Sequence, residues 1–120
     1  MSQIRNSEVE FIEAQEGSKI KHYFDPKNTS NGIRFSMIQC VLESGQKSKK
    51  HKLRSSEIFY ILEGHEKLTI HDKSFNLEKD DSVFVPSNSE QSIENTGVND
   101  LKFLCIVDPA WQAKDEVVLG

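Results

Sequence analysis

A histidine and a glutamate six residues apart, His51 and Glu57, are the residues best suited to chemistry in this sequence. A neutral imidazole can act as a base or ligate a metal, and a nearby carboxylate can orient the ring or bind the metal itself. Side chains alternate faces along a strand, so a continuous strand would direct His51, Leu53 and Glu57 into one interior. A turn near residues 55 and 56 would alter that parity. The structural alternative is an interior pair that is hydrogen-bonded without a catalytic task.

The elements that must position these residues are short. Apolar runs of about four to seven residues alternate with turn signals roughly every ten residues, which is typical of an all-β sandwich or barrel. Residues that favour turns separate the runs, and no long helix is expected. The predicted strands are 33–42, 57–62, 67–71, 74–77, 82–85, 91–94 and 101–107.

Two of these strands, 57–62 and 101–107, are apolar on both faces. Each face must then be covered, one by the opposing sheet and the other by a partner subunit or by the terminal segments. The pattern therefore predicts a homodimer.

The ends of the chain carry weaker signals. Residues 7–10 match a capping box and Gly17 suits the end of a helix, but too few apolar residues lie in 8–15 to separate a helix from an edge strand. Asp108 and Pro109 suit the start of a short helical turn that returns Trp111 to the body. Trp111 would then close a mouth of the barrel over a ligand, or plug the core or an interface.

Composition limits the class of protein. The chain has 120 residues, so we expect 1–120 to form a single domain. With 15 Lys and Arg against 19 Asp and Glu, the net charge of -4 argues against a nucleic-acid partner. No secretion signal or membrane span is found, and Cys40 and Cys105 lie within apolar runs. We therefore expect a cytoplasmic protein with free buried thiols and no membrane partner.

The stretch from Gly45 to Gly64 resembles the first motif of the cupin family, G-x5-H-x-H-x3,4-E-x6-G. Gly45, His51, Glu57 and Gly64 fall at the family's spacing. Leu53 stands where the family has its second histidine. Four separated matches make this motif specific.

A later stretch is similar to the second cupin motif, G-x5-P-x-G-x2-H-x3-N. Pro86 and Asn95 match it, whereas Asp80, Asn88 and Gln91 stand in place of two glycines and a histidine. Aspartate and asparagine are the non-glycine residues that best tolerate left-handed backbone, so the first two replacements are mild.

The resemblance covers about residues 33–107. It implies a cupin double-stranded β-helix, which is a jelly-roll barrel of two antiparallel sheets with the ligand site between them. Residues 1–32 would be an N-terminal extension, and residues 108–120 a tail that packs on the barrel.

In cupins with the full motif, two histidines and the glutamate of the first motif join a histidine of the second to hold a divalent transition metal. Carried to this chain, the resemblance implies His51, Glu57 and Gln91 as ligands of one ion such as Zn, Fe, Mn or Ni. Leu53 contributes nothing to that set. An imidazole, a carboxylate and an amide bind a divalent ion more weakly than three imidazoles and a carboxylate. Gln91 can instead hydrogen-bond a ligand or a neighbouring polar group, so metal occupancy stays open.

Two functions follow from the resemblance. We expect either a metal-dependent enzyme of the dioxygenase or sugar-isomerase type, or a metal-free binding module or sensor in which Leu53 forms an apolar wall and Gln91 hydrogen-bonds the ligand. A metal-free isomerisation with His51 as base rests on residue type alone. In each case the barrel binds a small polar or anionic molecule, and the lysines within residues 47–52 favour an anion.

Overall fold

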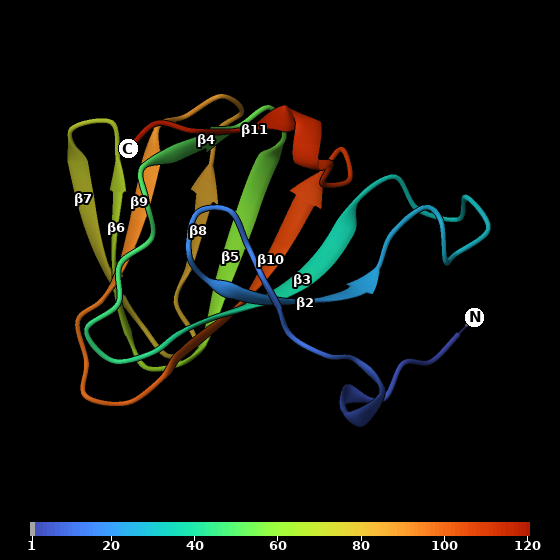
Figure 1. Cartoon of the computed structure of the whole chain (residues 1–120), viewed down its shortest axis with the longest axis horizontal. Coiled ribbons are helices and arrows are strands. Elements are labelled where there is room, and N and C mark those ends of the chain that lie inside the picture. The colour runs from blue at the N-terminus through green and yellow to red at the C-terminus, as the bar shows by residue number, and fades with distance from the viewer. Residues whose placement is uncertain (1) are drawn as a thin grey trace.

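The computed structural model describes residues 2–120, and these form two antiparallel sheets that enclose one core (Figure 1). One sheet has six strands in the order β1-β2-β3-β10-β5-β8, and the other has five in the order β11-β4-β9-β6-β7. The predicted all-β jelly-roll barrel of two antiparallel sheets is confirmed. The strands are β1 (Ile12–Glu13), β2 (Lys19–Phe24), β3 (Ser36–Leu42), β4 (His51–Leu53), β5 (Ser56–Glu63), β6 (His65–Ile70), β7 (Lys73–Glu78), β8 (Ser82–Val85), β9 (Gln91–Asn95), β10 (Leu101–Asp108) and β11 (Glu116–Val118).

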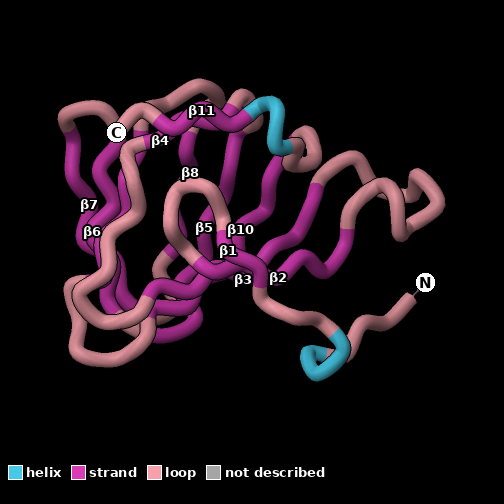
Figure 2. Tube along the Cα trace, in the orientation of Figure 1, coloured by secondary structure: helices cyan, strands magenta, loops and turns pink. Residues whose placement is uncertain are grey.

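Helical structure is confined to two 3-10 turns in the described chain, η1 (Asn6–Glu8) and η2 (Ala113–Asp115), which are the cyan segments of Figure 2. No helix in residues 2–120 has the length and apolar character needed to cross a membrane. For residues 8–15 the sequence left a helix and an edge strand open. The structure has the two-residue edge strand β1 there, which pairs with β2.

The predicted helical turn after Asp108 is wrong. The chain stays non-helical through Trp111, and the bond between Asp108 and Pro109 is cis. The backbone N–H groups that a helix would use are bound elsewhere: that of Ala110 donates to the carbonyl of Arg34 at 2.9 Å, and that of Trp111 donates to Ser36 Oγ at 3.0 Å. These bonds still return Trp111 to the barrel.

Left-handed backbone occurs where the motif comparison placed it. Asp80 and Asn88 have φ of 72° and 61°, which confirms that they replace glycine at positions requiring this conformation. Gly64 has a φ of 91°, and an added Cβ would lie 2.8 Å from the carbonyl oxygen of Asp100. Only glycine fits there, in the tight connection between β5 and β6.

The core lies between the sheets, and inward residues of β2, β3, β4, β5, β6, β8, β9 and β10 form it. Phe59 and Phe103 pack at its centre with ring centroids 4.9 Å apart. Burial alternates along β5: its inward residues are buried, whereas Ile58 and Tyr60 on the outer face are 48% and 42% exposed. One face of this strand is therefore uncovered in the single chain.

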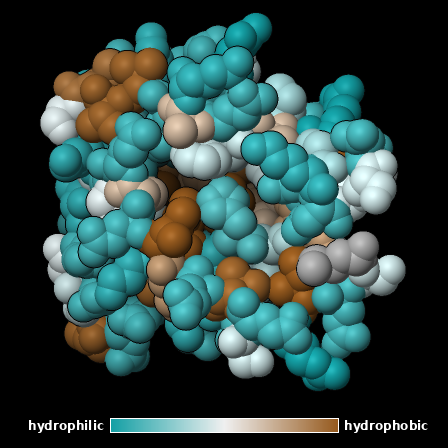
Figure 3. Space-filling model, turned by 45° about the vertical axis from the view of Figure 1, so that its right-hand side comes forward, coloured by the Kyte–Doolittle hydropathy of each residue, from teal (hydrophilic) through white to brown (hydrophobic). Residues whose placement is uncertain are grey.

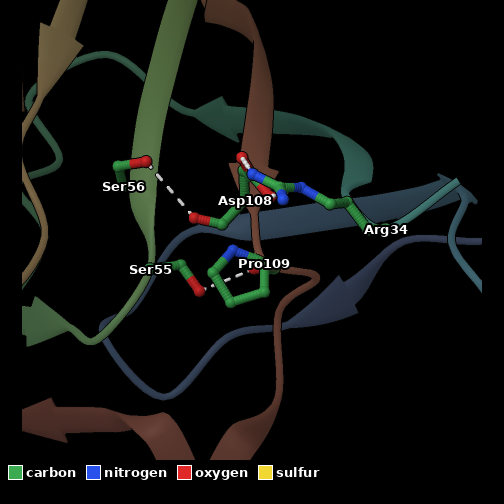
Figure 4. A network of polar contacts seen from close by, with 5 residues as sticks. All are labelled: Arg34, Ser55, Ser56, Asp108 and Pro109. Carbon is green, nitrogen blue, oxygen red and sulfur yellow. Dashed lines mark hydrogen bonds and ion pairs between the residues drawn. The ribbon is translucent and has the colours of Figure 1, made fainter.

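The segment that follows β10, residues 109–118, is the C-terminal arm, and polar contacts tie its start to the barrel (Figure 4). Arg34 holds the Asp108 carboxylate with two bonds of 3.0 and 2.9 Å. Ser55 Oγ donates to the carbonyl of Pro109 at 2.6 Å, and Ser56 Oγ donates to that of Asp108 at 3.2 Å. The arm ends as β11, which pairs with β4.

Candidate ligand site in the barrel

A cavity of about 60 Å³ opens between the two sheets. One water needs roughly 10–15 Å³ on the same measure, so the cavity fits a ligand of only a few non-hydrogen atoms. Figure 3 shows a mostly hydrophilic surface with apolar atoms visible in a recess near the middle of the view. Most of the cavity wall is apolar, and its polar groups come from Glu16, Ser18, Cys40, His51, Glu57, Cys105, Trp111 and Glu116.

His51, Leu53 and Glu57 all line this cavity, although not along the one continuous strand that the parity argument assumed. Their exposures are 6%, 4% and 8%. The strand breaks at residues 54 and 55, where β4 of one sheet ends before β5 of the other begins. His51 and Glu57 therefore come from opposite sheets, and the short connection between those sheets brings them to the same cavity.

Both carboxylate oxygens of Glu57 accept hydrogen bonds from neighbours. The Gln91 amide nitrogen donates to Oε1 at 2.6 Å, and the Cys105 thiol donates to Oε2 at 3.0 Å. Burial raises the pKa of Glu57, while these two donors and the nearby imidazole of His51 oppose that rise. Both oxygens of Glu57 are thus already hydrogen-bonded to side chains of the protein.

His51 is oriented by its own backbone segment. Its Nδ1 lies 2.7 Å from the carbonyl oxygen of Lys49, and because a carbonyl can only accept, Nδ1 carries the proton. When the ring is neutral, its lone pair therefore lies on Nε2. In this form His51 can accept a proton or a hydrogen bond from a bound molecule.

Gln91 lies directly opposite His51 in the pairing of β4 with β9, and it is 2% exposed. It is not part of the cavity wall. Its nitrogen is bound to Glu57, and its Oε1 is buried without a hydrogen-bond partner in the described chain. Gln91 therefore positions Glu57 in this arrangement.

The donor set does not fit the metal centre that the cupin resemblance implies. Leu53 offers a hydrocarbon wall, Gln91 presents an N–H group to Glu57, and both oxygens of Glu57 already accept hydrogen bonds. Within residues 2–120, no three His, Cys, Asp or Glu side chains are grouped so as to hold a metal ion.

Two carboxylates on the cavity wall were not predicted from the sequence. Glu16 lies in the turn between β1 and β2, and Glu116 begins β11. Burial raises the pKa of Glu116, and the His51 imidazole counteracts this. No local motif marks either residue, because their positions depend on the pairing of chain segments remote in sequence.

The two cysteines are free thiols, as predicted, and both line the cavity. Burial raises the pKa of Cys40 and of Cys105 well above the usual value, and nearby carboxylates add to the effect. Both groups are therefore protonated near neutral pH, which suits Cys105 as a donor to Glu57.

Trp111 forms part of the cavity wall and also packs against the core. Its ring lies against that of His22, with centroids 5.3 Å apart. Burial lowers the pKa of His22, so this histidine is a neutral packing partner. Two roles were predicted for Trp111, closing the mouth of the barrel and plugging the core. Its position on the cavity wall and against the core is compatible with both.

Comparison with known proteins agrees with this fold. The family model described as "Cupin domain" matches residues 38–107, more than half of the chain. An uncharacterized protein of Methanocaldococcus jannaschii is 33% identical over 106 residues, which are 88% of this chain and 84% of that protein.

Two solved structures are similar. The crystal structure of a predicted oxalate decarboxylase from Thermotoga maritima has a TM-score of 0.74 and 28% identity, with 88% of this chain and 96% of that chain covered. A cupin-2 domain from Rhodospirillum rubrum has a TM-score of 0.79 over 99% of this chain and 80% of that chain, and at 18% identity it supports the fold alone. Because the family model matches more than half of the chain and the relative is 33% identical over most of it, this chain belongs to the cupin family.

Proposed function

We propose that this cupin domain binds a small molecule in the barrel cavity without a resident metal ion. The observation that carries the proposal is the state of Glu57, whose two oxygens accept hydrogen bonds from Gln91 and Cys105. A metal ligand at this position would have to give up or share those bonds. Leu53 completes an apolar wall where a second imidazole would be needed.

The cavity has the features of a small binding pocket. Its walls are mostly hydrocarbon, and its few polar groups converge from both sheets and from the C-terminal arm. The lone pair of His51 supplies an acceptor for the ligand. This arrangement supports recognition directly, whereas catalysis would need a base or acid in contact with a substrate, a role open only to His51 and the carboxylates.

A metal measurement and a ligand screen test the proposal together. The protein is purified without a nickel column, its metal content is measured, and thermal shifts are recorded for sugars, sugar phosphates, organic acids and amines with and without EDTA. We expect far less than one metal per chain, and stabilisation by at least one compound that EDTA does not abolish. Stoichiometric metal that is lost in His51→Ala but kept in His65→Ala, an exposed histidine, would contradict the proposal.

A second candidate function is decarboxylation of oxalate, which the similarity to the Thermotoga maritima protein favours. Its test is release of CO2 from oxalate by the purified protein with added divalent metal. Turnover that is lost in Glu57→Gln would support this candidate over metal-free binding. No turnover is expected, because oxalate is a dianion and no lysine or arginine among the described residues lines the cavity.

We also propose that a second copy of the chain covers the outer face of β5 and β8. Ile58 and Phe84 are 48% and 59% exposed and lie opposite each other in the pairing of these strands. Ile106 flanks them on β10. Since β8 is the edge of its sheet, a two-fold axis there would let the same apolar residues of both copies meet.

A further inference from the structure

We propose that the ligand of the cavity is a small cation, a protonated amine with a short hydrocarbon body. This inference rests on the proposed binding function and specifies the class of ligand. It departs from the anion favoured by the lysines within residues 47–52. The residue that carries it is Glu16, which lines the cavity and has one carboxylate oxygen that is buried without a partner in the described chain.

The backbone holds Glu16 in place. The turn between β1 and β2 closes with the N–H of Ala14 donating to the carbonyl of Ser18 at 2.8 Å, and Gly17 has a φ of 106°. The carbonyl of Glu16 accepts a bond of 2.6 Å from the N–H of Lys49, which ties this turn to the segment before His51. Glu16 is therefore held at the cavity by two segments of the chain.

The two oxygens of the Glu16 carboxylate differ in their surroundings. Oε1 accepts hydrogen bonds from the backbone N–H and the hydroxyl of Ser18. Oε2 is buried and accepts no hydrogen bond in the described chain, and the whole residue is only 6% exposed. A buried carboxylate oxygen without a donor is costly, so a ligand N–H group would fill a vacant position.

Acidic side chains outnumber basic ones around the cavity. Glu57 and Glu116 line it together with Glu16, and His51 is the one basic side chain on the wall of the described protein. Cys40 and Cys105 are uncharged thiols near neutral pH and add no positive charge. An anion entering this site would therefore meet carboxylates, and a cation would be attracted.

The nearby lysines do not reverse this charge. Lys49 and Lys50 are exposed, and Lys50 lies 3.6 Å from Glu90. The buried Lys21 directs its Nζ to the side chain of Asn6 at 2.8 Å and over the ring of Phe11 at 4.5 Å. None of these residues belongs to the cavity wall.

The apolar wall selects the body of the ligand. Ile20, Ile38, Leu53, Phe59 and Phe103 surround the volume beside the carboxylates. This wall favours a branched hydrocarbon over a sugar, which would bury hydroxyl groups without partners. An ammonium group on about four carbons matches both the carboxylates and the size of the cavity.

Three molecules of matched shape test the inference. Binding of isobutylamine, isobutanol and isobutyrate is measured at pH 7 by isothermal titration calorimetry, and the contact is located by nuclear magnetic resonance shifts of the cavity amides. We expect the amine to bind most tightly and the carboxylate most weakly. Glu16→Gln should weaken the amine about 10- to 100-fold, as loss of a charged hydrogen-bond partner does, with little change for the alcohol. Glu13→Gln, at an exposed position of β1, is the matched control and should change neither.

The outcomes separate this inference from the binding function on which it rests. If isobutyrate or isobutanol binds at the cavity as tightly as the amine, the proposal of a cationic ligand is overturned, while the proposed binding function stands. If none of the three binds, the inference fails, while the broader ligand screen decides the binding function. Should Glu16→Gln lower the melting temperature, Glu116→Gln removes a second cavity carboxylate and must also weaken the amine selectively; an unchanged affinity would contradict the inference.

Discussion

Glu66 is a buried carboxylic acid that the candidate site does not use. It is 1% exposed on β6, and neither of its oxygens has a hydrogen-bond partner in the described chain. Burial without partners raises its pKa to about 8. The residue is therefore protonated in the folded protein at neutral pH and ionised in the unfolded chain.

Because of Glu66, we expect stability to fall as the pH rises. Its folded pKa lies above the unfolded value, so its contribution is fully present below about pH 4.5 and is lost as the pH rises towards 8. The free energy of unfolding should drop by a few kcal/mol over this range, at about 1.4 kcal/mol per pH unit. Urea unfolding at pH 5 and pH 8 measures the drop. Glu66→Gln should flatten the profile and the exposed control Glu10→Gln should not; equal slopes in both variants would refute this assignment.

The two replaced histidines account for the missing metal ligands in this cupin. We expect the double variant Leu53→His with Gln91→His to bind Co²⁺ or Zn²⁺ at least about tenfold more tightly than the wild type, because imidazoles suit these ions and Gln91 no longer occupies Glu57. Calorimetry and the visible spectrum of Co²⁺ report the binding. A wild-type protein that binds Co²⁺ as tightly as the double variant would show that its own residues suffice.

At the scale of elements, the C-terminal arm forms one wall of the cavity through Trp111 and Glu116. Its start is held by the Arg34 pair with Asp108, in which the Arg34 side chain is 82% exposed. Exposed pairs contribute about 0–1 kcal/mol, so Arg34→Met should change global stability by less than about 1 kcal/mol. The amides of Ala110 and Trp111 should nevertheless exchange hydrogen faster as the arm opens locally. Arg54→Met is the control, and equal exchange in both variants would count against this role.

The elements that could be predicted from the sequence are those with local patterns. Strands such as β5 and β10 combine apolar runs with flanking turn residues. Parity holds for His51 and Leu53 within β4, whereas Glu57 reaches the same cavity from the other sheet, across the break in the strand. The strands β2, β4 and β11 were missed, because each is short or rich in polar residues and is defined by its partner strand. Glu16 and Glu116 were missed because no motif marks them: a backbone bond from Lys49 ties the Glu16 turn to the cavity, and the pairing of β11 with β4 positions Glu116.

At the scale of the whole molecule, the outer face of β5 and β8 bears directly on assembly. Ile58 and Phe84 form the centre of an apolar surface that a monomer would expose to water. If a second copy covers it, the particle in solution has twice the 13.7 kDa mass of the chain. The melting temperature then rises with protein concentration, since dimerisation stabilises the folded state by mass action.

Light scattering after size-exclusion chromatography tests this assembly with single charges placed on the face. Ile58→Lys and Phe84→Lys should each produce a 13.7 kDa monomer at micromolar concentration, because association would bury an unpaired ammonium group. Val98→Lys is the control: Val98 is 88% exposed in a loop, so its variant should remain dimeric. If all three variants keep the dimer mass, a different face forms the interface. If the wild type is monomeric, the proposed dimer is wrong. The cavity would still bind its ligand, because one chain forms it alone.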